Sequence, residues 1–379
     1  MKILDKYIFK SVFFTAIFSV GLFVFVLVSG YAVKEVIGKL ASGLFTVESF
    51  VKALVVLVPY VTSYALPMGL LTAILIVLGR LSAENEITAM KSVGISLFRL
   101  SRPVFLVAIM GVCFAVAINL YYAPIAKTSF REGFVNMIKE NPLQFIKPKT
   151  FIKTFPGYVI YAGERDGSAL EDFWIWELDD QKRVTMLIKA ERGSLHYDSD
   201  NEVMILNLEK GTGEKRSNDD PENYSDQNVP TLVYDSLSLN LPMDQILGKK
   251  GVNRKLSMLT MAELLQKKKE WKIKEQEGVQ DAYRERISVQ TQIQKNFAMA
   301  FSVFALAMIA IPLAIRVRRS ETFANLAIAL VLGMTYYFLM VVVSWIDKKP
   351  ALRPDILIWL PDIGFLLLGM FLFRKASKN

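Results

Sequence analysis

Long apolar runs separated by short basic segments make up both ends of this chain. Six runs are long enough to cross the apolar core of a bilayer, which is roughly 30 Å thick. They cover residues 11–33, 48–78, 104–122, 297–315, 323–346 and 356–373. Lys and Arg gather before the first run, between the second and third, between the fourth and fifth, and after the sixth. The positive-inside rule therefore predicts six transmembrane helices with both termini in the cytoplasm.

The middle of the chain has the pattern of a water-soluble β domain. Short runs of alternating apolar and polar residues are separated there by turn-forming clusters such as Asp166-Gly167. Strands without helices between them are typical of an antiparallel sandwich or jelly roll. Thr260 and Glu263 then form a capping box that opens a connector helix.

These patterns predict an α+β membrane protein with six transmembrane helices and a β-jellyroll-like domain inserted between the third and fourth. The expected divisions are residues 1–126 for helices one to three, 127–294 for the outer β domain and connector helix, and 295–379 for helices four to six.

Composition excludes several classes of function. The 379 residues are 53% hydrophobic and carry a formal charge of +9, but most short-loop cations flank the apolar runs, so nucleic acid is not an expected partner. One cysteine, Cys113, and one histidine, His196, leave little for metal binding or nucleophilic catalysis. We therefore expect no cofactor, no metal and no enzymatic activity. Asn119 and Asp362 are polar exceptions within the runs and are expected at their periphery, which weakens an ion-coupled carrier mechanism.

The segment between the second and third runs predicts a short helix at the cytoplasmic membrane face, over about 82–97. Ser82 is placed to cap its N-terminus, Glu84 and Glu86 lie in its first turn, and Gly94 is placed to end it. An apolar face is predicted from the helical spacing of Ile87, Met90, Val93 and Leu97. Taken alone, the pattern also fits a solvated helix that only links two spans.

Several stretches resemble the LptF/LptG (YjgP/YjgQ) family, the permease subunits of the lipopolysaccharide exporter. They are residues 79–96, the N-terminal Leu4-Asp5-Lys6-Tyr7-Ile8, Ile311-Pro312-Leu313-Ala314, Tyr336-Tyr337 and Trp359-Leu360-Pro361-Asp362. The resemblance covers most of the chain, whereas the β region matches only in kind. It implies a permease of the bacterial inner membrane with a periplasmic β domain.

The resemblance also implies partners and a mechanism. Two such permeases pair, their first and fifth spans form lateral gates, and an LptB-like ATPase grips each one through its coupling helix. The β domains then pass lipopolysaccharide to a bridge of LptC/LptA-like β-jellyroll proteins. The ATPase must be a separate chain, since the sequence has no Gly-x-x-x-x-Gly-Lys-Ser/Thr loop.

Six residues acquire expected roles from this resemblance. Coupling to the ATPase is assigned to Glu84, Glu86, Met90 and Gly94, and contact with lipid to Lys34 and Lys39. Simpler roles remain open, because Glu86 also fits a helix-capping carboxylate and the lysines also fit snorkelling cations. The sequence supports both the F-like and the G-like member.

A second class of function also fits these patterns. A membrane-anchored structural or sensing protein would use its β domain to bind an outer partner or ligand and its inner helix to report that binding.

Overall fold

The computed structural model describes most of the chain, which forms two compact units. The described ranges are 3–32, 47–140, 148–152, 157–166, 169–179, 181–198, 203–216, 230–241, 254–317, 322–346 and 350–378. Contacts divide the chain into a helical unit of residues 1–33, 54–129 and 255–379 and a second unit of residues 34–53 and 130–254. The connector segment 255–294 thus groups with the helices.

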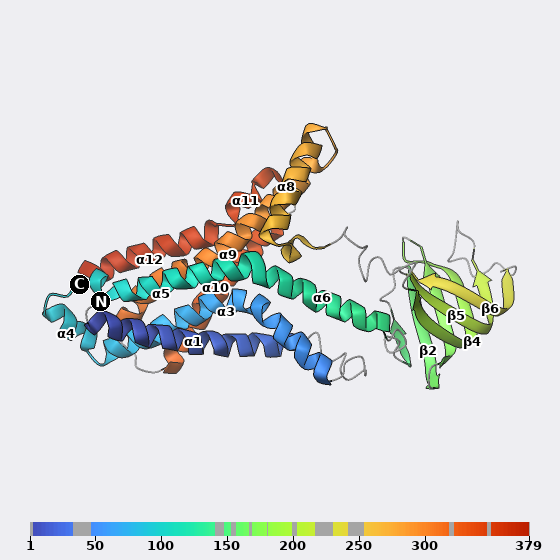
Figure 1. The fold of residues 1–379 in the computed structure, drawn as a ribbon, viewed down its shortest axis with the longest axis horizontal. Helices are drawn as coiled ribbons and strands as arrows, with labels where there is room; N and C mark the ends of the chain where they lie inside the picture. Colours follow the sequence, from blue (N-terminus) through green and yellow to red (C-terminus); the bar gives the residue numbers. More distant parts are fainter. Residues whose placement is uncertain are drawn as a thin grey trace. The chain divides into compact units, whose positions relative to one another are not determined.

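Six helical segments in the described ranges are long and apolar enough to cross a membrane, as predicted. In chain order the main helices are α1 (Ile3–Tyr31), α3 (Val47–Ala83), α4 (Glu86–Ser92), α5 (Leu97–Ala117), α6 (Ala123–Glu140), α8 (Met261–Gln276), α9 (Ala282–Val317), α10 (Thr322–Trp345), α11 (Pro354–Leu357) and α12 (Leu360–Lys378) (Figure 1). A π-helical turn, η2 (Ile118–Tyr122), joins α5 to α6, and two 3-10 turns are η4 (Leu256–Met258) and η6 (Pro350–Leu352).

The core of the helical unit is centred on α3 and α9. Of the most apolar stretch of each helix, 89% is buried in α3 and 72% in α9, against 17% in α1 and 28% in α10. Two close approaches hold the outer helices against α3. A Cβ on Gly69 of α3 would lie 2.4 Å from the side chain of Val20 in α1, and a Cβ on Gly333 of α10 would collide with the side chain of Met68. Glycine is required at both positions because the helices pack without room for a side chain.

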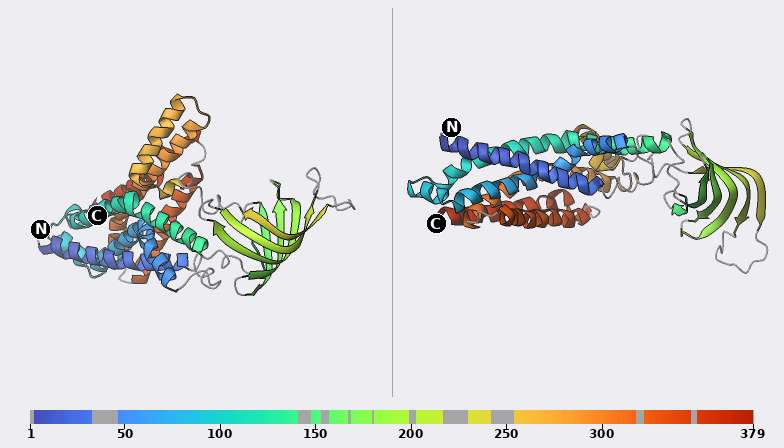
Figure 2. Two further views of the ribbon diagram at one scale, coloured as in Figure 1. Left: turned by 45° about the vertical axis from the view of Figure 1, so that its right-hand side comes forward. Right: turned by 90° about the horizontal axis from the view of Figure 1, so that it is seen from below.

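The second unit contains one six-stranded antiparallel sheet. Its strands are β1 (Thr150–Ile152), β2 (Tyr158–Asp166), β3 (Ala169–Leu178), β4 (Val184–Asp198), β5 (Val203–Lys215) and β6 (Thr231–Leu241). They are hydrogen-bonded in sequence order, and the sheet is strongly curved (Figure 2). The predicted α+β class with an inserted antiparallel β domain is therefore confirmed. The described strands form a meander, however, and not the Greek-key order of a jelly roll or the two layers of a sandwich.

Alternation along the strands explains the core of this sheet. Ile160, Ile175 and Ile188 are direct cross-strand neighbours and are buried on the inner face. Phe173 lies beside them, fully buried, and a Cβ on Gly193 would lie 2.6 Å from its ring. Small residues opposite a large ring allow the sheet to curl over its own apolar face, which is how a single sheet buries so many side chains.

Candidate functional site

At its N-terminal end, the segment between α3 and α5 differs from the predicted structure. The helix α3 continues through Ser82, which is buried and whose hydroxyl donates a hydrogen bond of 2.8 Å to the carbonyl of Ile315 near the end of α9. The chain then turns at Asn85, which adopts a left-handed conformation with φ 58°. Ser82 therefore links α3 to α9 and is not the N-cap of α4. The helix α4 has seven residues, Glu86–Ser92, whereas the prediction covered about 82–97.

The C-terminal end of α4 is built as predicted. Gly94 has φ +80°, its N–H donates to the carbonyl of Lys91, and the N–H of Ile95 donates to the carbonyl of Met90. This pair of hydrogen bonds is a Schellman motif, in which glycine is favoured because its backbone is left-handed. Ser96 then caps α5 by accepting a hydrogen bond of 3.3 Å from the N–H of Arg99. The chain is thus fixed on both sides of α4.

The two faces of α4 differ in character. Ile87 is 2% exposed and Met90 is partly buried against the helical core, whereas Val93 is 75% exposed. The predicted apolar face is therefore confirmed for Ile87 and Met90 and wrong for Val93, which lies in the turn after the helix. Glu84 is exposed and Glu86 half-buried, and neither carboxylate forms an ion pair with a residue that the structure describes. Glu84 lies in the turn before α4 and not in its first turn as predicted, so Glu86 alone is the acidic residue of the helix, whose apolar side is anchored.

A polar pocket of about 190 Å³ lies where α3, η2, α6 and α9 meet. Lys127 Nζ donates to Ser257 Oγ at 2.8 Å, and Lys295 Nζ donates to Ser344 Oγ at 3.1 Å. Lys127 also experiences the positive charges of Lys255 and Lys295. Lysines from α6 and α9 therefore converge on one pocket, which we call the α6/α9 pocket.

Unpaired polar atoms face this pocket as well. Asn119 comes from the π-helical turn and is 5% exposed; its Nδ2 donates to the carbonyl of Asn296 at 3.3 Å. Its Oδ1 and the hydroxyl of Ser63 are buried without a hydrogen-bond partner among the described residues. Buried polar atoms without partners are rare in folded proteins, and π-helical turns occur often at functional sites. Asn119 lies near the end of the third apolar run, as expected, but its burial beside a pocket was not predicted, and neither Lys127 nor Lys295 was selected as a candidate. The available signal was that each of the two lysines lies at a boundary between a polar and an apolar segment of the sequence.

The two lysines expected to contact lipid, Lys34 and Lys39, lie outside the described residues. Their role stays a prediction.

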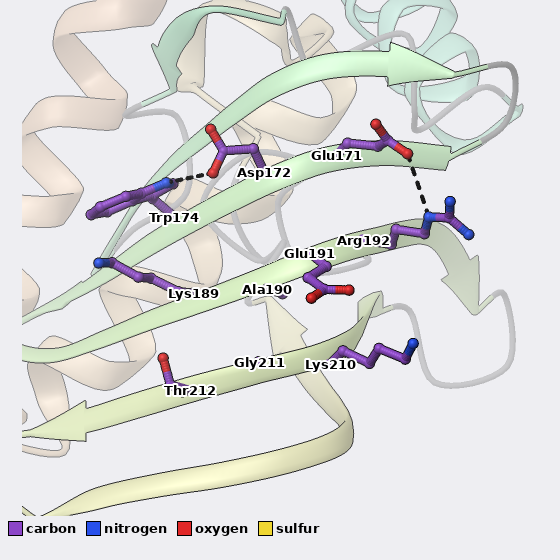
Figure 3. A pocket seen from close by; sticks show the side chains of 10 residues that line it. All are labelled: Glu171, Asp172, Trp174, Lys189, Ala190, Glu191, Arg192, Lys210, Gly211 and Thr212. Atoms are coloured by element: carbon purple, nitrogen blue, oxygen red, sulfur yellow. Dashed lines mark hydrogen bonds and ion pairs between the residues drawn. The ribbon is translucent and has the colours of Figure 1, made fainter.

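A shallow hollow of about 610 Å³ on the sheet is lined by charged and aromatic side chains of neighbouring strands (Figure 3). Lys189 Nζ lies 3.8 Å from the centre of the Trp174 ring, whose Nε1 donates to Asp172 Oδ1 at 2.8 Å. Arg192 and Glu171 form an ion pair of 3.4 Å on neighbouring strands. Since these charged and aromatic groups satisfy one another across the strands, the hollow is best explained as an ordinary polar sheet face.

The fold and these features define a class of membrane protein. The chain is a multi-pass membrane protein in which an antiparallel sheet is inserted between two sets of three apolar helices, and a short helix links the second and third of them. Residues 6–375 match the family described as lipopolysaccharide export system permease LptF/LptG. The match spans nearly the whole chain, so the chain belongs to this family. A comparison with curated proteins gives no match.

Proposed function

We propose that this chain is the permease subunit of an ATP-driven complex that extracts lipopolysaccharide from the inner membrane and delivers it to a periplasmic β-jellyroll bridge. The observation that carries the proposal is the family match over residues 6–375, on a chain with six candidate spans and an inserted sheet. In the proposed orientation both termini and α4 are cytoplasmic and the sheet is periplasmic. A paralogous permease, an LptB-like ATPase and LptC/LptA-like proteins are the proposed partners.

The acidic end of α4 supports the proposed contact with an ATPase. Glu84 is exposed in the turn before α4 and Glu86 is half-buried at the start of the helix, and within the described chain neither has a basic partner. Carboxylates in this position can form charge-assisted hydrogen bonds with Arg or Lys in a groove of the ATPase. We assign docking to Glu84 and Glu86, and we assign Met90 and Gly94 to anchoring and ending the helix that presents them.

Contacts behind α4 provide a path for movement. Ser82 is hydrogen-bonded to the end of α9, and Lys91 Nζ donates to the carbonyl of Ala376 in α12 at 3.2 Å. Ile87 inserts into the same helical core. A displacement of α4 by a partner would therefore reach the ends of α9 and α12 as a rigid shift, because packed helices move as bodies and do not deform continuously.

The outer helices support the proposed lateral gate. α1 and α10 expose large apolar side chains, including Phe18, Phe25 and Phe338. In a membrane protein such faces contact lipid or other helices. We propose that α1 and α10 pack against a paralogous permease and that the separation of these faces admits lipopolysaccharide.

The α6/α9 pocket supports contact with an anionic lipid head group. Lys127 and Lys295 line it, and an oxygen-rich, negatively charged phosphate or sugar acid would be attracted to them in a low-dielectric setting. Lys34 and Lys39 are proposed to act on the same class of group at the outer end of the first span. The pocket is too small for a whole glycolipid, so it would hold one charged group of it.

Copurification tests the coupling part of this proposal. We expect Glu86→Arg to abolish retention of the ATPase by the tagged permease, because it replaces a carboxylate by a cation facing a basic groove. Glu277→Arg makes the same charge reversal at an exposed carboxylate after α8 and should retain the ATPase. Retention of the ATPase, with its lipid-stimulated turnover, by Glu86→Arg would contradict the proposed docking. A membrane-anchored sensor, the other class considered, would bring down no ATPase with either form.

Crosslinking tests the lipid part. A photoreactive residue in α1 should crosslink lipopolysaccharide less in Lys34→Glu and Lys39→Glu, and one in η2 should do so less in Lys127→Gln. Lys272→Gln, an exposed lysine on α8, is the matched control and should leave both crosslinks unchanged. Unchanged crosslinking in the three test variants would remove these contacts from the proposal.

A further inference from the structure

A second pocket, of about 280 Å³, lies at the end of the bundle where α1 begins and α12 ends, which Figure 1 marks by the two termini. It is formed by the last turn of α4, the end of α9 and the end of α12. Its lining residues are Lys91, Pro312, Leu313, Ile315, Arg316, Leu372, Lys375 and Ala376. We call it the terminal-face pocket.

The polar part of this pocket is entirely basic. Lys91, Arg316 and Lys375 come from three different helices, and the described lining contains no carboxylate. Part of the hydrogen-bonding capacity of Lys91 is already used, since its Nζ donates to the carbonyl of Ala376. Arg316 and Lys375 are exposed, and among the described residues neither has an ion pair or side-chain hydrogen bond. Like charges gathered without a counter-ion repel one another, so an anion placed between them would be stabilised.

The remaining wall is apolar and continues along the membrane-facing side of α12. Leu372 lines the pocket, and Leu368, one helical turn before it, is 48% exposed. Phe371, one turn before Lys375, is 64% exposed. Residues four apart lie on the same side of a helix, so an apolar track leads from the basic site towards the interior of the bilayer. This order, with cations at the membrane face and a hydrocarbon track beneath, matches a phospholipid.

The size of the pocket selects the part of the lipid that enters it. Pockets that enclose a drug-sized ligand measure about 300–1,000 Å³, so a volume of 280 Å³ suits a head group whose acyl chains remain outside. Basic pockets between membrane helices are known places for acidic lipid head groups. Lys91 is bound to a carbonyl at the end of α12, and Arg316 also offsets the dipole of α9 from its last turn. Neither Arg316 nor Lys375 makes a described contact with a carbonyl, so their N–H groups stay available to an anion.

We propose that the terminal-face pocket binds the phosphate head group of an anionic phospholipid from the adjacent leaflet. Arg316 and Lys375 hold the phosphate, Lys91 assists from α4, and an acyl chain lies along Leu372 and Leu368. The bound lipid would bridge α4, α9 and α12. This proposal does not depend on what the protein transports.

Native mass spectrometry of the purified full chain tests the site. The delipidated protein is titrated with phosphatidylglycerol and with phosphatidylcholine of the same acyl chains. We expect one tightly held phosphatidylglycerol per chain, preferred over phosphatidylcholine by about tenfold or more, since each cation near a membrane surface favours an anionic lipid appreciably. The variant Arg316→Gln/Lys375→Gln should lose this preference.

A matched double variant controls for general surface charge. Arg102→Gln/Arg374→Gln removes the same charge from exposed residues that do not line the pocket and should keep the preference. Leu368→Ser should weaken retention of phosphatidylglycerol by interrupting the apolar track. An equal loss in both double variants, or a preserved preference in Arg316→Gln/Lys375→Gln, would overturn the proposal. Complete displacement by excess inorganic phosphate would show a site for a free anion and would overturn the assignment to a lipid.

Discussion

Tyr336 of α10 donates a hydrogen bond of 3.1 Å to Oδ1 of Asp362 in the first turn of α12. Both side chains are fully buried, and Asp362 Oδ2 has no hydrogen-bond partner among the described residues. Asp362 lies near the start of the last span, as expected from the sequence, but its complete burial was not predicted. A buried carboxyl group with one partner is costly, so the tyrosine hydroxyl is important to the α10–α12 contact.

Tyr336→Phe should lower the free energy of unfolding by about 1–3 kcal/mol, because it leaves a buried acceptor without its donor. Thermal unfolding of the purified protein in detergent measures the effect. Tyr121→Phe is the control, since that ring is 56% exposed and its change should have little effect. Equal unfolding temperatures for the two variants would show that the hydrogen bond contributes nothing.

Asp362→Asn should leave stability unchanged or raise it. The amide keeps an oxygen that accepts the hydrogen bond from Tyr336, and it removes the cost of holding a carboxyl group in an apolar core. Asp362→Ala loses the acceptor and leaves a cavity, so it should unfold at a lower temperature than Asp362→Asn. An unfolding temperature of Asp362→Asn clearly below that of the unmodified protein would mean that the carboxyl group itself stabilises the bundle.

Gly369 and Gly364 provide a matched pair on α12. A Cβ on Gly369 would lie 2.9 Å from the backbone of α9 at Met308 and Ile309, whereas a Cβ on Gly364 would meet nothing within 4 Å. Gly369→Ala should therefore force α12 away from α9 and lower the unfolding temperature. Gly364→Ala should be neutral or stabilising, since alanine favours a helix by about 1 kcal/mol over glycine. Similar effects of the two changes would contradict the close packing of α9 and α12.

Much of the fold follows from local pattern. The six apolar runs and the alternating strands each predict their own element, because bilayer thickness and strand pleating impose a repeat on nearby residues. Gly94 was placed correctly for the same reason, since a Schellman motif is defined by consecutive residues.

Features that depend on distant residues could not be predicted this way. Ser82 has the local signature of a helix cap, yet its hydroxyl bonds to a carbonyl 233 residues later in the chain. Asp362 begins a helix and therefore looked peripheral, but the packing of Tyr336 buries it. The α6/α9 pocket joins Lys127 and Lys295, and no sequence period relates these positions.

Substitutions of Ile87 and Val93 can distinguish the anchoring of α4 in the helical core from the docking of the ATPase onto α4. Ile87 is buried in the helical core and Val93 is 75% exposed. If α4 transmits movement, Ile87→Ala should still copurify with the ATPase, because Glu84 and Glu86 remain, but lipid-stimulated ATP turnover should fall several-fold. Val93→Ala should change neither property. Full turnover in Ile87→Ala would argue against transmission through this side chain.

The turn between β3 and β4 has a charge-dependent stability. Asp179 Oδ1 accepts hydrogen bonds from the N–H groups of Arg183 (2.8 Å) and Gln181 (2.9 Å), and Oδ2 accepts one from Arg183 Nε at 2.8 Å. The backbone N–H of Arg183 contributes most, and together with the guanidinium it outweighs the opposing effect of desolvation and lowers the pKa of Asp179 below its usual 3.8. A carboxyl group whose pKa is lower in the folded chain stabilises the fold above its unfolded pKa and loses this effect as the pH falls through the folded value.

Asp179→Asn should therefore loosen the β3–β4 turn at neutral pH and matter less as the pH falls below about 4. Hydrogen exchange at the amides of this turn, corrected for the intrinsic rate at each pH, measures the difference from the unmodified protein. Asp235→Asn, at an exposed carboxylate on β6, should show no such difference. A difference in exchange rate between Asp179→Asn and the unmodified chain that stays constant across this pH range would mean that the ionisation of Asp179 does not stabilise the turn. A difference in exchange rate that disappears at acid pH would identify the ionised carboxylate as the acceptor of the two backbone N–H hydrogen bonds.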